Sequence, residues 1–329
     1  MTIEVFCHLP AVQLKDIEEY HLCDGKLMHL PFDFWRQLDG TFELEWKNYE
    51  KANPVFYVAR LESENIEINL LLESIENTLH DISLALLLYP GYYLLPDYGH
   101  SCMYVLVDGQ LYFQQVGAFN REWIVYGDVW YYLYTAEDLQ QVDAIFKYMQ
   151  RFEKMYAYPD LNDAIYYLRE TAFVDFVYEG IGHRQSYTNY KNGFIRVMSF
   201  LESMLFPAEK NERYELSLTR AFGYYGAALL EREPNQLAPL AAQLSELYSL
   251  RSKLVHGIVL QPDEAAQVEN QAKLARYYFC RMIIRLMMLY KNEITTEPVK
   301  VLLSECLQRN GDEVVFNLEK IQAYNALMK

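Results

Sequence analysis

The stretch LAPLAAQLSELYSLRSKLVHG, residues 237–257, decides the fold of the second half of the chain. Its leucines recur at intervals of three and four residues, which is the spacing of one face of an α-helix. Gly257 follows the last of these leucines, in the position after a helix end that favours a left-handed residue. The pattern predicts an amphipathic helix from about Leu237 to His256.

The segments on both sides of this helix carry further helical signals. Thr135 and Asp138 have the spacing of a capping box and predict a helix that runs toward Tyr156. More helices are expected from Pro159-Asp160 onward, over about 192–206, over about 214–232, and from Pro262 to about Lys291. No strand pattern is recognised among them. Residues 136–329 are therefore predicted to form an all-α bundle of antiparallel helices.

Residues 1–135 mix strand and helix patterns. Asp108-Gly109 suits a tight turn and separates two strand-like runs, 102–107 and 110–116, so a hairpin is expected there. Further strands are expected at 54–61, 66–72 and within 123–134, whereas 74–88 has helical spacing. The sequence predicts an α+β domain over 1–135, which we interpret as the part that recognises a partner or trigger.

Composition and charge exclude several classes of protein. The 329 residues are 52% hydrophobic and 22% charged, which rules out a disordered, collagen-like or low-complexity chain. The net charge of −16 rules out a nucleic-acid binder held by bulk positive charge. Residues 1–135 contain 7 basic and 20 acidic side chains, so the acidity lies mainly in the first domain. An anionic ligand is expected to bind the second.

The cysteines and the apolar segments predict the compartment. Five cysteines, odd in number and without a C-x-x-C pair, indicate a reducing environment rather than a disulfide framework. The first residues lack the pattern of a signal peptide, and no apolar run is long enough to span a bilayer. We therefore expect a cytoplasmic protein without membrane contact. The 29 tyrosines are interpreted as packing residues rather than as base-stacking platforms.

Arg251 and His256 are the residues in which we expect the chemistry. Arginine offers a planar, permanently charged fork for a phosphate, and histidine exchanges protons near neutral pH. Together they suit phosphodiester chemistry. Positions five apart on an ideal helix differ by about 140° around the axis and about 7.5 Å along it, so a loosened helix end or a second chain is needed to place both in one cleft. The alternative is a solvated arginine and a histidine that caps the last carbonyls.

Three segments resemble the HEPN family, and in particular its Apea-like branch. They are Phe200-Leu201-Glu202-Ser203-Met204-Leu205, Tyr214 to Arg220-Ala221, and Leu247 to Gly257 with its Arg251 and Val255-His256-Gly257. The order of the three segments is that of the Apea-like branch. The resemblance covers about residues 160–290.

The resemblance implies a HEPN-like helical bundle that forms a homodimer, so that two copies of the motif line one cleft. Many members are metal-independent ribonucleases. Mapped by position, Arg251 would stabilise the phosphate, His256 would act as general acid or base, and Glu202 could hold Arg251. The family often has Asn, Asp or His after the arginine, whereas this chain has Ser252. Local positive charge would come from Lys253, Lys273, Arg276, Arg281 and Arg285.

The sequence thus predicts a metal-independent endoribonuclease of a defence or toxin-type protein, with RNA as substrate and no cofactor. Two alternatives remain: a catalytically silent HEPN module for dimerisation, nucleotide or partner binding, and a structural protein in which Arg251 and His256 are buried and paired. A zinc site among Cys7, His8, His21, Cys23 and His29 has no recognised ligand spacing. No P-loop or dinucleotide fingerprint occurs.

Overall fold

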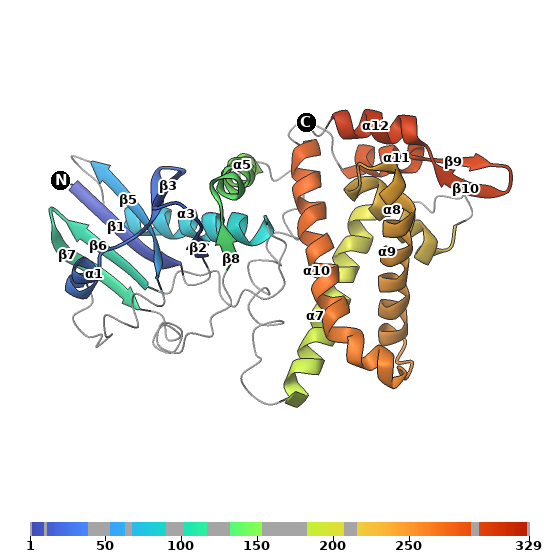
Figure 1. Cartoon of the computed structure of the whole chain (residues 1–329), viewed down its shortest axis with the longest axis horizontal. Coiled ribbons are helices and arrows are strands. Elements are labelled where there is room, and N and C mark those ends of the chain that lie inside the picture. Colours follow the sequence, from blue (N-terminus) through green and yellow to red (C-terminus); the bar gives the residue numbers. More distant parts are fainter. Residues whose placement is uncertain are drawn as a thin grey trace. The chain divides into compact units, whose positions relative to one another are not determined.

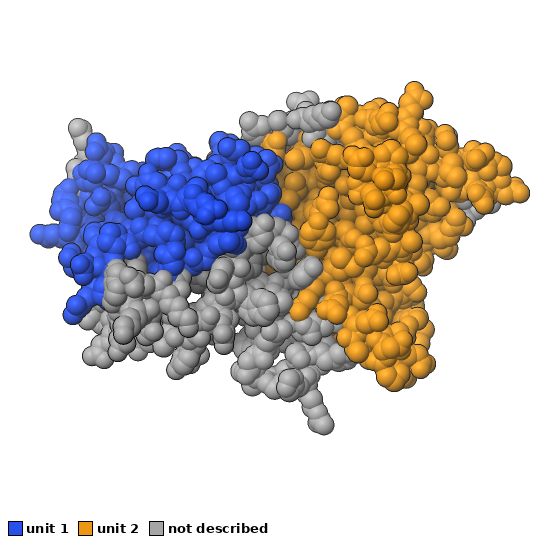
Figure 2. Space-filling view, viewed as in Figure 1, with its two compact units in different colours: residues 1–90, 94–147 blue, residues 91–93, 148–329 orange. Residues whose placement is uncertain are grey.

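The computed structural model describes residues 2–9, 12–38, 53–62, 68–89, 102–116, 132–152, 183–206, 216–290 and 296–327. The chain divides into two compact units, which are coloured separately in Figure 2. Unit 1 comprises residues 1–90 and 94–147, and unit 2 comprises residues 91–93 and 148–329. The first contains an antiparallel sheet with helices, whereas the second is mainly helical (Figure 1). This agrees with the predicted α+β region followed by a helical region.

The sheet of unit 1 has six strands in the order β3-β4-β5-β1-β6-β7, and every neighbouring pair is antiparallel. Strand β1 lies inside the sheet and alternates its side chains between the two faces. Phe6 joins the core cluster on the face where Phe34 packs against it, with ring centroids 5.1 Å apart. The strand bounds are β1 Thr2–Leu9, β3 Glu19–Leu22, β4 Gly25–His29, β5 Val55–Glu62, β6 Cys102–Val107 and β7 Gln110–Val116.

The turn between β6 and β7 confirms the predicted hairpin. Asp108 and Gly109 both have positive φ, 47° and 79°, as a two-residue turn that matches the strand twist requires. The Asp108 side chain accepts the backbone N–H of Thr2 at 2.8 Å, which ties the turn to the start of β1. The predicted strand at 54–61 is also confirmed by β5.

Three helices and a short parallel strand pair complete the described part of unit 1. The helices are α1 Phe32–Leu38, α3 Ile68–Leu88 and α5 Ala136–Phe152, and the pair is β2 Val12–Leu14 with β8 Tyr132–Tyr134. The strand expected at 66–72 is wrong: from Ile68 onward these residues begin α3, whose helical period continues to Leu88. Of the run 123–134, the structure describes only the last three residues, as β8.

The capping box before α5 is confirmed. Thr135 Oγ1 accepts the backbone N–H of Asp138 at 3.2 Å, and Asp138 Oδ2 accepts the backbone N–H of Thr135 at 2.8 Å. Most of helix α5 belongs to unit 1, which continues to Lys147. The sequence analysis placed the boundary at residue 135. The change of pattern at Thr135 coincides with the start of this helix.

Unit 2 is organised around four helices: α7 His183–Leu205, α8 Leu218–Leu230, α9 Pro234–Val255 and α10 Pro262–Tyr290. They confirm the helices predicted at about 192–206, 214–232, 237–256 and 262–291. Helix α9 packs mainly on α8, and α10 packs mainly on α7. Helix α9 begins at Pro234, earlier than expected, because a proline is accepted in the first turn of a helix. The helix predicted from Pro159-Asp160 lies outside the described residues.

Two glycines allow α8 and α9 to approach closely. A β-carbon at Gly223 would lie 2.3 Å from the carbonyl oxygen of Ala241, and one at Gly226 would lie 2.7 Å from Leu244 Cδ1. Neither position leaves room for a side chain. This contact fixes α9, the helix of the candidate site, against α8.

The prediction that only helices follow Thr135 is wrong. After α11 (Thr296–Glu305), strands β9 (Leu307–Asn310) and β10 (Glu313–Phe316) form an antiparallel hairpin, and α12 (Leu318–Ala326) follows. The Tyr224 hydroxyl of α8 donates to the Val314 carbonyl at 3.1 Å, and its ring packs at a tilt against Phe316 with centroids 5.0 Å apart. The hairpin is thereby attached to α8. Among the described helices, none is long and apolar enough to cross a membrane.

Candidate functional site

The candidate site lies on the C-terminal half of α9. Leu244, Leu247 and Leu254 of this helix are buried, as the leucine spacing predicted. Since α9 packs beside both α8 and α7, the same turns bring Tyr248 and Arg251 against Glu202 of α7. The site is therefore assembled by two helices that are distant in the sequence.

Glu202 holds both Arg251 and Tyr248. Its Oε2 lies 3.1 Å from Arg251 Nη2, and its Oε1 accepts a hydrogen bond from the Tyr248 hydroxyl at 3.0 Å. The Arg251 guanidinium also lies over the Tyr248 ring, 5.7 Å from the centroid. The ion pair agrees with the sequence expectation that Glu202 holds Arg251. Tyr248 was not predicted for the site, although its position three residues before Arg251 puts it on the same side of the helix.

The side chains that make these contacts are partly buried from solvent. The side chains of Arg251 and Glu202 are 19% and 28% exposed. Arg251 Nε is buried and has no hydrogen-bond partner among the described residues. Burial, reinforced by the hydrogen bond to Glu202, raises the pKa of Tyr248 to about 12, so its hydroxyl remains a proton donor at neutral pH. Arg251 is therefore held in one orientation, and part of its charge is compensated by Glu202.

His256 lies at the end of α9 with an exposed side chain. Its backbone N–H donates to the Ser252 carbonyl at 3.0 Å, and Gly257 follows with φ of 68°. The N–H of Ile258 bonds to the Lys253 carbonyl at 2.9 Å and that of Gly257 to the Leu254 carbonyl at 3.4 Å, which completes a Schellman helix end. The backbone alone fixes this end, so the imidazole is left to solvent.

The structure does not join Arg251 and His256 within one chain. No hydrogen bond or ion pair connects them in the part of the chain that is described, and Arg251 is directed to α7. The alternative in which both residues are buried and paired is wrong for His256, because its side chain is exposed. Arg251 is paired with Glu202 but remains partly exposed, so it meets only the pairing half of that alternative.

Ser252 and Lys253 stand between these two residues. Ser252 is partly exposed, and its carbonyl contributes to the helix end described above. Lys253 forms an ion pair with Glu264 of α10, and Glu264 also accepts the backbone N–H of Gln261 at 3.1 Å. The Lys253 ammonium lowers the pKa of Glu264. Lys253 therefore links α9 to the start of α10, and its charge is already compensated.

The positive surface expected from α10 is smaller than the sequence suggested. Arg276 is 2% exposed and Arg285 is 9% exposed, so both belong to the interior of unit 2. Burial, together with the neighbouring Arg232 and Arg281, lowers the pKa of Arg285 to about 10. Lys273 and Arg281 are partly exposed. The inner face of α10 thus includes two arginines, and composition alone does not show which basic residues of a helix are buried.

The described residues contain no group of three His, Cys, Asp or Glu side chains that could hold a metal ion. Of the residues considered for zinc, His8 is buried in the sheet, and burial lowers its pKa to about 3. His29 Nδ1 lies 3.1 Å from the carbonyl of Pro54.

No family model, no curated protein and no solved structure was found to match this chain. A function for the protein is therefore inferred from the geometry of its own residues.

Proposed function

We propose that the protein is a metal-independent endoribonuclease with a HEPN-like helical unit. The observation that supports this proposal is that one helix carries both an arginine oriented by Glu202 and, at its end, a histidine with an exposed imidazole. Arginine suits the charge of a phosphodiester, and a solvent-exposed histidine can give or take a proton. RNA is the proposed substrate, and unit 1 is the proposed receiver of the trigger or partner in a defence or toxin-type system.

The proposed reaction needs two copies of the chain. A single chain supplies one His256, whereas cleavage through the ribose 2′-OH uses a base and an acid. In a homodimer, one His256 takes the proton of the 2′-OH while that oxygen attacks phosphorus. The second His256 protonates the 5′ oxygen as its bond to phosphorus breaks. Arg251 of either copy stabilises the negative charge that develops on the phosphate.

The test is cleavage of single-stranded RNA in the presence of EDTA. The expected products carry a 2′,3′-cyclic phosphate (or the 3′-phosphate from its hydrolysis) and a 5′-hydroxyl, and DNA is not cleaved. His256→Ala should abolish cleavage, and so should Arg251→Ala. His21→Ala serves as a matched control, because His21 is also exposed but lies on β3 of unit 1. Products that end in a 5′-phosphate, or cleavage that requires Mg²⁺, would contradict the proposal.

The dimer is tested separately by light scattering. We expect a dimer at micromolar concentration through unit 2. A strict monomer under conditions in which RNA is cleaved would exclude the two-histidine site.

A second candidate function is a catalytically silent module that works through dimerisation or through binding a nucleotide or a partner. It is favoured by the Glu202–Arg251 ion pair, which already satisfies part of the arginine charge. A dimer that binds RNA or a nucleotide without cleaving it, and whose binding survives His256→Ala, would favour this function over the nuclease.

A further inference from the structure

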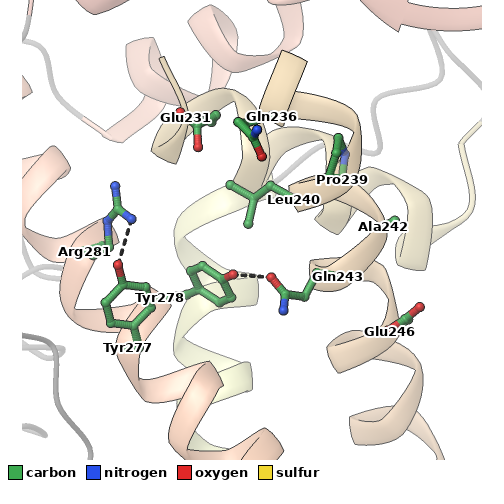
Figure 3. Close-up of a pocket in the computed structure, with 10 residues that line it drawn as sticks. All are labelled: Glu231, Gln236, Pro239, Leu240, Ala242, Gln243, Glu246, Tyr277, Tyr278 and Arg281. Atoms are coloured by element: carbon green, nitrogen blue, oxygen red, sulfur yellow. Dashed lines mark hydrogen bonds between the residues drawn. The ribbon is translucent and has the colours of Figure 1, made fainter. Parts of the chain in front are cut away.

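A hollow lies toward the N-terminal end of α9, where residues of that helix and of the middle of α10 line it together. It has a volume of about 500 Å³, within the range of ordinary small-molecule sites. Figure 3 shows its lining: α9 supplies Gln236, Pro239, Leu240, Ala242, Gln243 and Glu246, α10 supplies Tyr277, Tyr278 and Arg281, and Glu231 comes from the end of α8. The hollow combines one arginine, two tyrosines and two amides with an aliphatic patch, and Glu246 lies at the edge away from Arg281.

Arg281 is the cationic group of this hollow. Its Nη1 donates to the Tyr277 hydroxyl at 2.9 Å, and its guanidinium lies 5.5 Å from the centroid of the same ring. These contacts orient the side chain but use one of its five N–H donors. None of the carboxylates in the described part forms an ion pair with it. The fork of Arg281 is therefore positioned and available for an anion.

Arg281 belongs to a local group of three arginines. Arg232 and Arg281 both lie close enough to Arg285 to disfavour its charged form. The acid that faces this group, Glu231, is engaged with the backbone: its Oε1 accepts the N–H of Arg232 at 2.8 Å and that of Glu233 at 3.0 Å. Glu231 is thus the lining carboxylate near Arg232, Arg281 and Arg285, whereas Glu246, the other acid of the lining, lies at the far edge of the hollow. An additional negative charge at this place relieves the mutual repulsion of the arginines.

The rest of the hollow suits an apolar, planar group. Tyr278 is buried, and its hydroxyl donates a hydrogen bond to Gln243 Oε1. The Tyr278 ring and the Gln243 amide together form one side of the hollow (Figure 3). Leu240 lies between Tyr278 and Gln236 in the same view. Because Gln243 accepts with its oxygen, its NH₂ group remains as a donor at the edge. An aromatic ring that rests on Leu240 and Tyr278 buries apolar surface there.

We propose that this hollow is a binding site for a small organic anion, with its carboxylate or phosphate on Arg281 and a planar body against Leu240 and Tyr278. The site is independent of the proposed nuclease. It uses the first half of α9, whereas Arg251 and His256 lie in the second half. Its failure and the failure of the nuclease proposal are therefore separate results.

Isothermal titration of the full chain with four simple probes tests the proposal. Benzoate carries the planar body and the charge, benzamide lacks the charge, benzylamine reverses it, and acetate lacks the ring. Phenyl phosphate, titrated in parallel, distinguishes a phosphate ligand from a carboxylate ligand. We expect benzoate or phenyl phosphate to bind at least about tenfold more tightly than benzamide, and acetate to bind several-fold more weakly than benzoate.

Two variants give opposite expected shifts. Arg281→Gln should weaken binding of benzoate about tenfold or more, because the charged fork is lost. Glu231→Gln keeps the oxygen that accepts the two backbone N–H groups but removes a negative charge, so it should strengthen binding by a few-fold. Circular dichroism of each variant verifies the fold.

Three results would overturn the proposal. One is equal binding of benzoate and benzamide, and another is unchanged binding in Arg281→Gln with an intact fold. The third is weaker binding in Glu231→Gln together with preferential binding of benzylamine or of a zwitterion such as phenylalanine. That last result would assign the hollow to a ligand with an ammonium group instead.

Discussion

The Glu202–Arg251 ion pair offers a direct test of how the site is held together. The two side chains are 28% and 19% exposed, and the pair lies between an exposed ion pair, worth about 0.2–1 kcal/mol, and a buried one, whose disruption costs about 3–5 kcal/mol. Glu202 also accepts the Tyr248 hydroxyl at 3.0 Å. We therefore expect Glu202→Gln or Arg251→Gln alone to lower the free energy of unfolding of unit 2 by about 2 kcal/mol.

A double-mutant cycle isolates the pair. Glu202→Gln keeps an acceptor for Tyr248, so the loss is mainly that of the charge on Glu202. The expected coupling energy is about 1 kcal/mol, measured by urea unfolding followed by far-ultraviolet circular dichroism. The matched control is the ion pair Lys320–Glu305, also in unit 2, in which Lys320 Nζ lies 3.4 Å from Glu305 Oε2. Its side chains are 54% and 41% exposed. Its coupling should be clearly smaller, because solvent screens it.

The reasoning fails if the coupling of Glu202 with Arg251 is no larger than that of the control. The two side chains would then be adjacent without stabilising each other, and the orientation of Arg251 would need another cause. High salt supplies a further check. Raising the ionic strength should weaken the control pair more than the partly buried Glu202–Arg251 pair.

Three further predictions concern stability. Gly223→Ala should lower the free energy of unfolding by about 3 kcal/mol, because the new β-carbon would lie 2.3 Å from the Ala241 carbonyl oxygen and would push α8 away from α9. A loss below about 1 kcal/mol would refute the close contact. Gly257→Ala should cost only about 1–2 kcal/mol, from strain at φ of 68°, since nothing lies within 4 Å of the added carbon; both are measured by urea unfolding. The pKa of His8 is lowered from 6.5 to about 3, so its contribution to stability is present above about pH 6.5 and is lost as the pH falls toward 3. Between about pH 7.5 and pH 5, wild type should lose about 2 kcal/mol more than His8→Gln, measured by tryptophan fluorescence, and equal losses would contradict a buried neutral imidazole.

Local signals in the sequence predicted the parts of the fold that local interactions determine. The Asp108-Gly109 hairpin, the Thr135 capping box and the end of α9 at Gly257 each depend on residues within a few positions of one another. The hairpin β9–β10 also has such a signal, the dipeptide Gly311-Asp312 between two short runs. It was missed because Leu307–Asn310 contains a single buried apolar residue. The strand predicted at 66–72 failed because a short apolar run does not distinguish a strand from a helix start.

The candidate site was predictable only in part. Glu202 and Arg251 were identified, and their contact was expected from the resemblance. The role of Tyr248 depends on how α9 is rotated against α7, which follows from the packing of both helices and from no local pattern. Arg276 and Arg285 appear in the sequence as positive charge, but the same packing places them in the interior. The hollow at Arg281 combines three helices and has no sequence signature.

The attachment of the β9–β10 hairpin to α8 bears on how the protein is synthesised. The hydrogen bond from Tyr224 to Val314 spans 90 residues, whereas α8 and α9 are joined by a short connection. At about 5–20 residues per second, the ribosome takes several seconds to make the chain between these two partners. During that interval α8 and α9 can pair through their glycine contact, but the side of α8 that carries Tyr224 has no hairpin to cover it. A newly made chain therefore exposes more of the Tyr224 ring than the finished protein does, and this ring is open to chaperones until the hairpin has been made.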